Sequence, residues 1–221
     1  MIIGVVGFLG SGKGTVGDII SEKYAFKKMA FADSLKDAVS AIFGWPRYLL
    51  EGDIKESREF RDKEDRYWST RMGRTITPRI VLQQVGSECM RDVFGKDIWI
   101  TSLLAKVMDI PNTTPIVITD CRFPNEVAAI QKIGGKVVRV VRGAEPKWYG
   151  VAWVTNMFPQ IDPQKNPMSQ IYPNVHISEW AWIGQEFDYT IYNNSDLFHL
   201  ESEVTKMLLS FEQKDTLHTS T

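Results

Sequence analysis

The sequence predicts an α/β fold in which a parallel sheet of about five strands carries helices on both faces. Three observations support this prediction. Apolar runs that suit buried strands alternate along the chain with stretches of helical periodicity. A glycine-rich loop separates the first of these runs from the first helical stretch, and a later run ends in a carboxylate. Strands joined by helices in this way form parallel sheets that are covered on both faces.

The first strand is expected at residues 2–6, and the loop GFLGSGKGT follows at residues 7–15, before a helical pattern that runs to about Tyr24. Glycines let a backbone fold tightly around an anion, and the helix N-terminus adds its partial positive charge. The residues expected to bind ATP are Gly10, Ser11, Gly12, Lys13, Gly14 and Thr15. Lys13 is the expected catalytic cation on the β and γ phosphates; the alternative is a glycine-rich turn with a surface lysine.

The residue after Lys13 is glycine, so no hydroxyl stands at the usual magnesium-ligand position, and Thr15 comes one place later. This loop resembles that of adenylate kinase and other nucleoside monophosphate kinases. The resemblance implies a P-loop NTPase fold with a monophosphate-binding insertion and a lid. It also implies phosphoryl transfer between small molecules, with Mg²⁺ held largely through water and Thr15 near the α-phosphate of ATP.

After a second strand at residues 27–32, a helix is expected from a cap at Asp33 or Ser34 to a stop at Gly44. Its apolar stripe comprises Leu35, Ala38, Val39 and Ile42. Mixed charges dominate residues 45–77, which is typical of a solvated surface. In a monophosphate kinase the subdomain that grips the substrate is inserted in this part of the chain, so we expect a substrate-binding insertion here.

Pro78 begins a further helix, which Gly95 interrupts. Its expected core face comprises Ile80, Val81, Leu82, Val85, Cys89 and Met90. Another helix is expected at residues 98–108. The apolar run at residues 115–120 ends in Asp120 and fits a buried parallel strand.

Pro124 opens a helix that reaches residue 133, and a strand at residues 136–141 has Arg142 at its carboxyl end. Residues 143–178 are loop-like, with Lys147 and Lys165 as their full cations, and a loop this long is expected to be a functional lid. The last expected elements are a strand at 188–192, a turn at Asn193-Asn194, a helix at 197–211 and a frayed tail at 216–221. The whole chain is expected to form one kinase domain with these two insertions.

Two side chains after the strand at residues 115–120 are candidate catalytic groups. Parallel sheets place their active residues at the carboxyl ends of strands, so Asp120 and Arg122 are expected to meet the loop that contains Lys13. Asp120 is predicted to orient magnesium through water or to take the acceptor's proton; the alternative is a helix N-cap or an aspartate at a strand end without such a role. Arg122 is predicted to hold phosphate and offset transition-state charge; a surface arginine paired with Glu126 is the alternative.

The sequence around these groups resembles the phage deoxynucleoside monophosphate kinase family. The matching segments are 119–126 (TDCRFPNE), 138–142 (VRVVR), 31–38 (FADSLKDA), 82–88 (LQQVGSE) with Arg91, and 175–179 (VHISE). They cover most of the chain in the same order, with weak stretches at residues 45–77 and 143–174. The resemblance implies phosphorylation of deoxynucleoside 5′-monophosphates by ATP, on a nucleoside monophosphate kinase-like core.

The resemblance also implies roles for single residues. Lys36 would contact the substrate side, Arg79 and Arg91 the monophosphate, Gln83 the base, and Arg122 and Arg142 the phosphates in transit. For Lys36 and Gln83 the alternative is an exposed side chain without such a role. His176 and Glu179 lie near the end of the expected lid. Histidine and glutamate are residue types that bind metals, but no third ligand accompanies them, which favours a hydrogen-bonded hinge of the lid.

Composition argues against several other classes of protein. The chain has 221 residues and a net charge of −1, which argues against a basic platform for nucleic acids. Cys89 and Cys121 are too few for a disulfide framework and lack metal-ligand spacing, so reduced, buried thiols are expected. No leader or membrane-length apolar run is seen, so we expect a cytoplasmic protein without membrane contact. The oligomeric state stays open, and a homodimer is among the alternatives.

The expected function is transfer of the γ-phosphoryl group of ATP, with Mg²⁺, to a deoxynucleoside monophosphate, which supplies precursors for DNA synthesis. Catalysis is expected to rest on positioning and charge neutralisation. One alternative is a kinase of another small acceptor, such as dephospho-CoA or phosphomevalonate. The other is an ATP-binding regulatory or DNA-processing module. The accepted bases and the choice between deoxyribose and ribose stay open.

Overall fold

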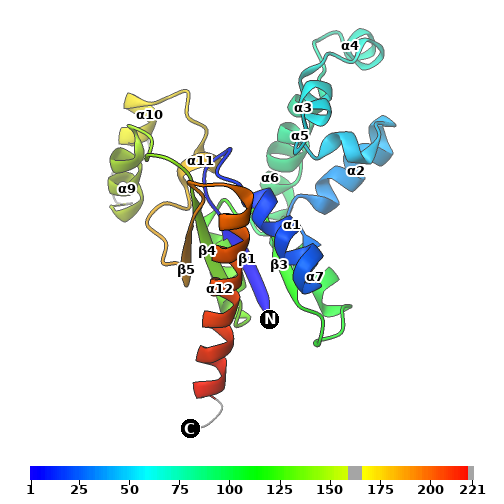
Figure 1. Cartoon of the computed structure of the whole chain (residues 1–221). Coiled ribbons are helices and arrows are strands. Elements are labelled where there is room, and N and C mark those ends of the chain that lie inside the picture. Colours follow the sequence, from blue (N-terminus) through cyan, green and yellow to red (C-terminus); the bar gives the residue numbers. More distant parts are fainter. Residues whose placement is uncertain (159–165, 219–221) are drawn as a thin grey trace. The chain divides into compact units, whose positions relative to one another are not determined.

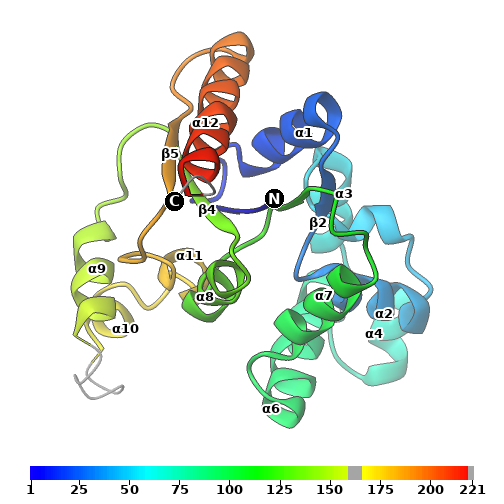
Figure 2. The same ribbon diagram turned by 90° about the horizontal axis from the view of Figure 1, so that it is seen from below.

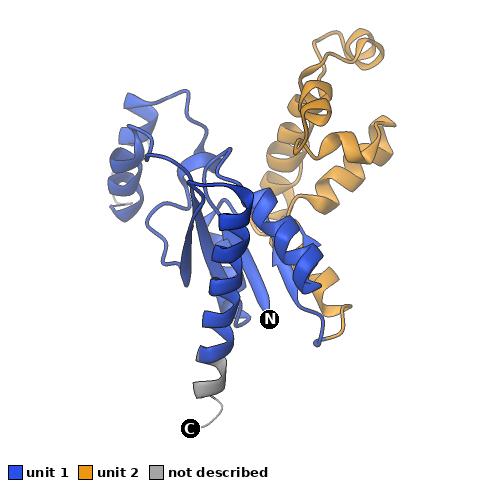
Figure 3. Cartoon of the chain, viewed as in Figure 1, with its two compact units in different colours: residues 1–29, 112–221 blue, residues 30–111 orange. Residues whose placement is uncertain are grey.

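The computed structural model describes residues 1–158 and 166–218, with side chains described as far as Gln213. The chain divides into two compact units (Figure 3). Unit 1 comprises Met1–Met29 and Asn112–Thr221, and unit 2 comprises Ala30–Pro111. Unit 1 contains the sheet, whereas the described elements of unit 2 are all helices. In the described part of the chain, no helix is both long and apolar enough to span a membrane.

The sheet of unit 1 has five strands in the order β2-β3-β1-β4-β5, and every neighbouring pair is parallel (Figure 1). The strands are β1 (Ile2–Val6), β2 (Lys27–Met29), β3 (Ile116–Ile118), β4 (Lys136–Val141) and β5 (Tyr189–Tyr192). In the central strand β1, Ile3 lies opposite Val117 of β3 and Lys136 of β4. The predicted fold class, a five-stranded parallel sheet with helices, is confirmed.

Helices cover both faces of this sheet. Helices α1 (Lys13–Tyr24) and α12 (Leu197–His218) lie on one face and α8 (Pro124–Lys132) on the other, as Figure 2 shows. Apolar side chains from α1 and α12 form the main core with those of β1, β3, β4 and β5. On the opposite face α8 approaches β1 closely, because a Cβ at Gly4 would lie 2.4 Å from Ile130 Cδ1. The amphipathic helices thus bury their apolar sides on strands that are apolar on both faces.

The segment expected to be a loop-like lid contains three helices in its described part. They are α9 (Tyr149–Met157), α10 (Pro167–Ile171) and α11 (Ile177–Trp180). Asn156 Nδ2 donates hydrogen bonds to the backbone oxygens of Trp180, at 2.9 Å, and Ile183, at 2.8 Å. These bonds tie α9 to the turn after α11. Because the described part of this segment contains three helices, the prediction that it is loop-like was wrong. Lys165 lies outside the described residues, as does the end of the tail.

Unit 2 is built from α-helices, one tighter 3₁₀-helical turn (η1) and one wider π-helical turn (η2). They are α2 (Asp33–Phe43), η1 (Arg47–Leu50), α3 (Lys55–Asp62), α4 (Arg66–Met72), α5 (Pro78–Gln84), η2 (Val85–Cys89), α6 (Arg91–Phe94) and α7 (Ile98–Met108). The charged segment rests on aromatic rings: Phe43 stacks on Trp45 at 4.6 Å and contacts Trp68 at 4.8 Å between ring centroids. Asp65 accepts the indole hydrogen bond of Trp45 at 2.7 Å. The segment with mixed charges therefore folds as helices, and its Trp45 and Trp68 pack on the Phe43 ring of α2.

The helix that begins at Pro78 does not continue to Gly95 with one apolar face. A π-helical turn, η2, interrupts it after Gln84 and α6 follows. The wider turn changes the direction in which later side chains point. Cys89 is consequently exposed, so its expected place on the core face was wrong, whereas Cys121 is buried as expected.

The start of unit 2 also differs from expectation. Strand β2 ends at Met29, and the N-cap of α2 is Ala32, because Asp33 is already the first helical residue. The Asp33 carboxylate accepts a hydrogen bond from Ala30 N at 2.7 Å, before the helix rather than inside it. Only part of the expected stripe is buried: Leu35 and Val39 are, but Ala38 and Ile42 are exposed.

Candidate active site

The glycine-rich loop joins the end of β1 to the start of α1. Gly10 and Gly12 have φ values of 79° and 100°, a left-handed conformation that favours glycine. Ser11 N donates to Phe8 O at 3.1 Å, and Val16 N donates to Gly12 O at 2.9 Å. A Cβ at Gly10 would meet no atom within 4 Å, so one side of the loop is open. The loop thus presents backbone to open space beside a helix N-terminus, which is the arrangement that binds phosphate.

The Lys13 side chain folds back over this loop. Its ammonium donates hydrogen bonds to Gly7 O at 2.7 Å and Phe8 O at 2.8 Å. Burial lowers the pKa of Lys13 to about 8, and the charge of Arg122 acts in the same direction. The carboxylates of Glu179 and Asp120 oppose this shift. The structure therefore brings the loop lysine, Asp120, Arg122 and Glu179 into one electrostatic environment.

Ser11 contributes a buried hydroxyl to the same loop. The residue is 3% exposed, and its Oγ has no hydrogen-bond partner among the described residues. Buried polar atoms are normally hydrogen-bonded, so this hydroxyl is available to a polar ligand atom or to water. A phosphate oxygen in the loop would satisfy it.

Arg122 follows β3 and reaches a carboxylate of α11. Its Nη1 donates to Glu179 Oε1 at 2.7 Å and to Ser178 Oγ at 3.4 Å. Glu126 does not take this side chain: its Oε2 accepts the backbone N–H groups of Arg122, at 2.7 Å, and Phe123, at 3.1 Å, at the start of α8. The alternative of a surface pair between Arg122 and Glu126 is therefore wrong. The N-cap position of α8 is occupied by Phe123 and not by Asp120.

His176 and Glu179 have separate partners. His176 Nδ1 lies 2.8 Å from Ser178 Oγ and accepts the Ser178 backbone N–H at 3.3 Å, which caps α11. Glu179 is paired with Arg122. Within the described ranges no group of three or more histidine, cysteine, aspartate or glutamate side chains could hold a metal ion. The H-x-x-E pattern is thus explained by a helix cap and an ion pair, and the role of Asp120 towards magnesium stays a prediction.

Arg142 is exposed and follows β4, the strand beside β1. Its two chain neighbours are held by the end of β5. Asn193 N donates to Val141 O at 2.7 Å, and Gly143 N donates to Asn194 Oδ1 at 2.7 Å. Parallel neighbours end at the same edge of a sheet, so Arg142 belongs to the edge that carries the loop.

An aromatic cluster lies beside the loop, and no motif in the sequence predicts it. The Phe8 ring lies 5.3 Å from that of Trp148 and 4.9 Å from that of Trp182. The Arg139 guanidinium stands 5.3 Å from the ring centroids of both Tyr149 and Trp182. This cluster connects the loop to the insertion.

The candidate acceptor-binding residues lie in unit 2. Lys36, whose side chain is 12% exposed, forms an ion pair with Glu51 rather than pointing into solvent. Arg79 makes two hydrogen bonds to the Asp62 carboxylate, one of them at 3.1 Å. Gln83 is exposed, and Arg91 is partly buried. Their substrate roles stay predictions.

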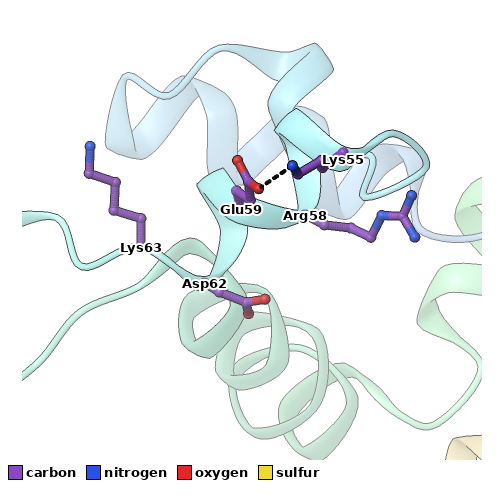
Figure 4. A pocket seen from close by; sticks show the side chains of 5 residues that line it. All are labelled: Lys55, Arg58, Glu59, Asp62 and Lys63. Carbon is purple, nitrogen blue, oxygen red and sulfur yellow. Dashed lines mark ion pairs between the residues drawn. The ribbon is translucent and has the colours of Figure 1, made fainter.

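A surface depression of about 670 Å³ lies on α3 (Figure 4). It is lined by Lys55, Arg58, Glu59, Asp62 and Lys63. Figure 4 shows Arg58 and Lys63 pointing in different directions, and Lys55 pairs with Glu59 at 3.6 Å. These side chains do not converge on one point, so the depression is an open charged surface and not a second candidate site.

Comparisons with known proteins give one sequence relative and several structural ones. No protein-family model matches the chain. A protein of Acanthamoeba polyphaga mimivirus named "Putative deoxynucleotide monophosphate kinase" is 30% identical over 152 residues, which are 64% of this chain and 74% of that protein. Dephospho-CoA kinase from Campylobacter jejuni aligns with a TM-score of 0.48 and 14% identity over 97% of this chain and 98% of its own. Shikimate kinase from Bacteroides thetaiotaomicron aligns with a TM-score of 0.45 and 15% identity over 96% and 98%.

Proposed function

The chain belongs to the deoxynucleotide monophosphate kinase family of that mimivirus protein and is a phosphotransferase, and on this premise we propose that it phosphorylates deoxynucleoside monophosphates with ATP. The products are ADP and a deoxynucleoside diphosphate, a precursor for DNA synthesis. The observation that carries the proposal is the environment of Lys13. A partly buried ammonium lies in the phosphate loop, and the charges of Arg122, Asp120 and Glu179 act on it. Such a group is suited to the negative charge of a triphosphate.

The donor side is assigned to the loop after β1. Its open glycine backbone and the helix N-terminus would bind phosphate oxygens, and the orphaned Ser11 hydroxyl would donate to one of them. Lys13 now donates to two neutral carbonyls. The β and γ phosphates of ATP are stronger acceptors because they are charged, so the ammonium would turn to them.

Magnesium fits this site as a partner of the substrate rather than as a resident ion. Asp120 would orient the ion through a water molecule, because a carboxylate oxygen is the type of group that a hydrated Mg²⁺ favours. When bound, the ion neutralises charge on the phosphates. Gly14 stands where many phosphate loops have a hydroxyl ligand, which agrees with contact through water.

The transfer needs positioning and charge neutralisation more than covalent help from the protein. An oxygen of the acceptor's 5′-phosphate attacks the γ-phosphorus, and the bond from that phosphorus to the bridging oxygen of ADP breaks in line. Arg122 would offset the charge of the transferring group, and Arg142 would bind phosphate at the same sheet edge. The Arg122 to Glu179 ion pair holds the guanidinium in place before substrates arrive.

The acceptor side is assigned to unit 2. Arg79 and Arg91 would bind the monophosphate, Gln83 the base, and Lys36 the substrate side. Asp62 and Glu51 keep Arg79 and Lys36 ordered through ion pairs. A phosphate dianion is a stronger partner for a guanidinium than a single exposed carboxylate, so substrate can compete for these cations.

A turnover screen tests the proposal. Purified protein, ATP and Mg²⁺ are combined with each deoxynucleoside and ribonucleoside monophosphate, and with dephospho-CoA and phosphomevalonate, and ADP and phosphorylated acceptor are quantified. We expect ADP release that requires a deoxynucleoside monophosphate. The proposal would be refuted if ADP release did not increase with any deoxynucleoside monophosphate, or if the phosphoryl group were transferred only to another acceptor. DNA-stimulated hydrolysis of ATP would indicate the DNA-processing alternative instead.

A further inference from the structure

Asn193 connects the end of β5 to the phosphate loop, although it is 182 residues away from Ser11 in the chain. The residue is 8% exposed. Its side-chain Nδ2 donates to Ser11 O at 2.9 Å, in a buried hydrogen bond, and its backbone N–H donates to Val141 O at 2.7 Å. One asparagine thus joins the ends of β4 and β5 to the loop that follows β1.

The fit between Asn193 and the loop is close. A Cβ placed on Gly12 would lie 2.3 Å from Asn193 Nδ2, far inside van der Waals contact. Gly12 also has a φ of 100°, which side-chain-bearing residues rarely adopt. The loop can therefore rest on this amide only because residue 12 has no side chain.

This hydrogen bond sets the direction of a backbone donor. The carbonyl of Ser11 and the N–H of Gly12 belong to one planar, trans peptide unit, so they point in opposite directions. With the carbonyl held by Asn193, the Gly12 N–H points away from Asn193. Loss of the amide would leave a buried carbonyl unsatisfied and allow the peptide unit to turn.

We propose that Asn193 is a positioning residue for the donor phosphates, acting through the Ser11 to Gly12 peptide unit. The inference rests on the proposed binding of ATP to this loop. Asn193 touches no phosphate in this role; it keeps a loop N–H aimed at the anion. Asn194 supports the same edge, because its Oδ1 accepts the Gly143 N–H beside Arg142.

The test compares Asn193→Ala and Asn193→Asp with the wild type. Asp has the same shape but presents an acceptor to the Ser11 carbonyl in place of the donor. For each protein, calorimetry gives the dissociation constants of ATP and ADP, and steady-state kinetics gives KM for ATP and for the deoxynucleotide. We expect both variants to bind ATP and ADP roughly tenfold to a hundredfold more weakly, with the deoxynucleotide KM unchanged.

Tyr24→Phe is the matched control. It removes another long-range hydrogen bond of unit 1, from the Tyr24 hydroxyl to Thr205 Oγ1 at 2.6 Å, and should lower stability without changing ATP affinity. If Asn193→Ala does not fold, Asn193→Asp decides the outcome. Wild-type ATP affinity in a folded Asn193 variant, or an equal rise of both KM values, would overturn the inference. A wild-type protein that fails to bind ATP would instead refute the proposed function.

Discussion

The surroundings of Lys13 in the fold disfavour the charged form of its side chain. Burial lowers its pKa to about 8, from an ordinary value of 10.5, and Arg122 adds repulsion. Two loop carbonyls and the carboxylates of Glu179 and Asp120 only partly compensate. A partly buried cation that costs stability is typical of a functional group, because an apolar side chain would occupy a purely structural position at lower cost.

Replacing this cation separates function from stability. Lys13→Met keeps the length of the side chain and removes the charge. We expect phosphoryl transfer to fall by at least about a thousandfold, because the main counter-charge of the phosphates is lost. The free energy of unfolding at pH 7 should stay equal or rise, since a partly desolvated ammonium is no longer present. Turnover assays and urea titration measure the two effects, and retained activity would remove Lys13 from the mechanism.

The pKa of Lys13 also predicts a pH dependence. As pH rises through about 8 the free protein loses this proton, so ATP affinity should fall by up to about tenfold per pH unit above that value. The unfolded chain keeps the proton to about 10.5, so it binds more protons between the two values. The contribution of Lys13 to the free energy of unfolding therefore rises over that window. Calorimetry with Lys13→Arg, which stays charged, should show flat ATP affinity; a matching decline would contradict the assignment.

Among the elements, α9 and the turn after α11 have the clearest connection to the site. The Phe8 ring contacts Trp148 and Trp182 edge-on or tilted, while Arg139 stacks on Trp182 and pairs with Glu145. The Phe8 carbonyl meanwhile accepts hydrogen bonds within the loop. The described part of the insertion is therefore packed against the phosphate loop, not separate from it.

Phe8→Leu tests this connection, because leucine keeps apolar volume but loses the aromatic contacts. We expect the free energy of unfolding to fall by about 1 kcal/mol and KM for ATP to rise severalfold as the loop loosens. Phe187→Leu is the matched control: Phe187 contacts Trp182 at 6.1 Å but is not part of the loop, so it should change stability alone. Equal effects of the two substitutions on KM for ATP would show that the ring only stabilises the fold.

For the whole molecule, the division into units separates the two groups of candidate residues. The chain leaves unit 1 after Met29 and returns at Asn112. The residues assigned to ATP all belong to unit 1, and Lys36, Arg79, Gln83 and Arg91 belong to unit 2. Arg122, assigned to the phosphates in transit, belongs to unit 1.

This division predicts that acceptor and donor binding respond to different substitutions. Arg79→Ala should raise KM for the deoxynucleotide roughly tenfold or more, because a charge-assisted fork is lost, and leave the dissociation constant of ATP unchanged. Lys55→Ala, on the exposed surface of α3, should change neither quantity. Kinetics and calorimetry on the two variants provide the comparison. Weaker ATP binding in Arg79→Ala, with an unchanged deoxynucleotide KM, would contradict the assignment.

Several elements are specified by local patterns in the sequence. The limits of β1, α1, α7 and β4 follow from apolar runs, glycine positions and helical periodicity, and the structure places them at or close to the expected residues. The elements expected from these patterns were wrong where packing overrides a pattern. The π turn after Gln84 turns Cys89 outward, and residues 143–178 contain helices that pack through Asn156, an amide with no recognisable signal in the sequence.

By itself, the sequence determined a phosphate loop between a strand and a helix, the parallel sheet behind it, and the carboxylate and arginine that follow β3. These depend on residues close together in the chain, and short-range backbone preferences make them readable. Only the tertiary structure decided that Arg122 pairs with Glu179, that Phe8 packs on the insertion, and that Asn193 holds the loop from β5. Those contacts join residues that become neighbours when the sheet assembles, and no local pattern encodes which distant side chain will satisfy a buried polar group.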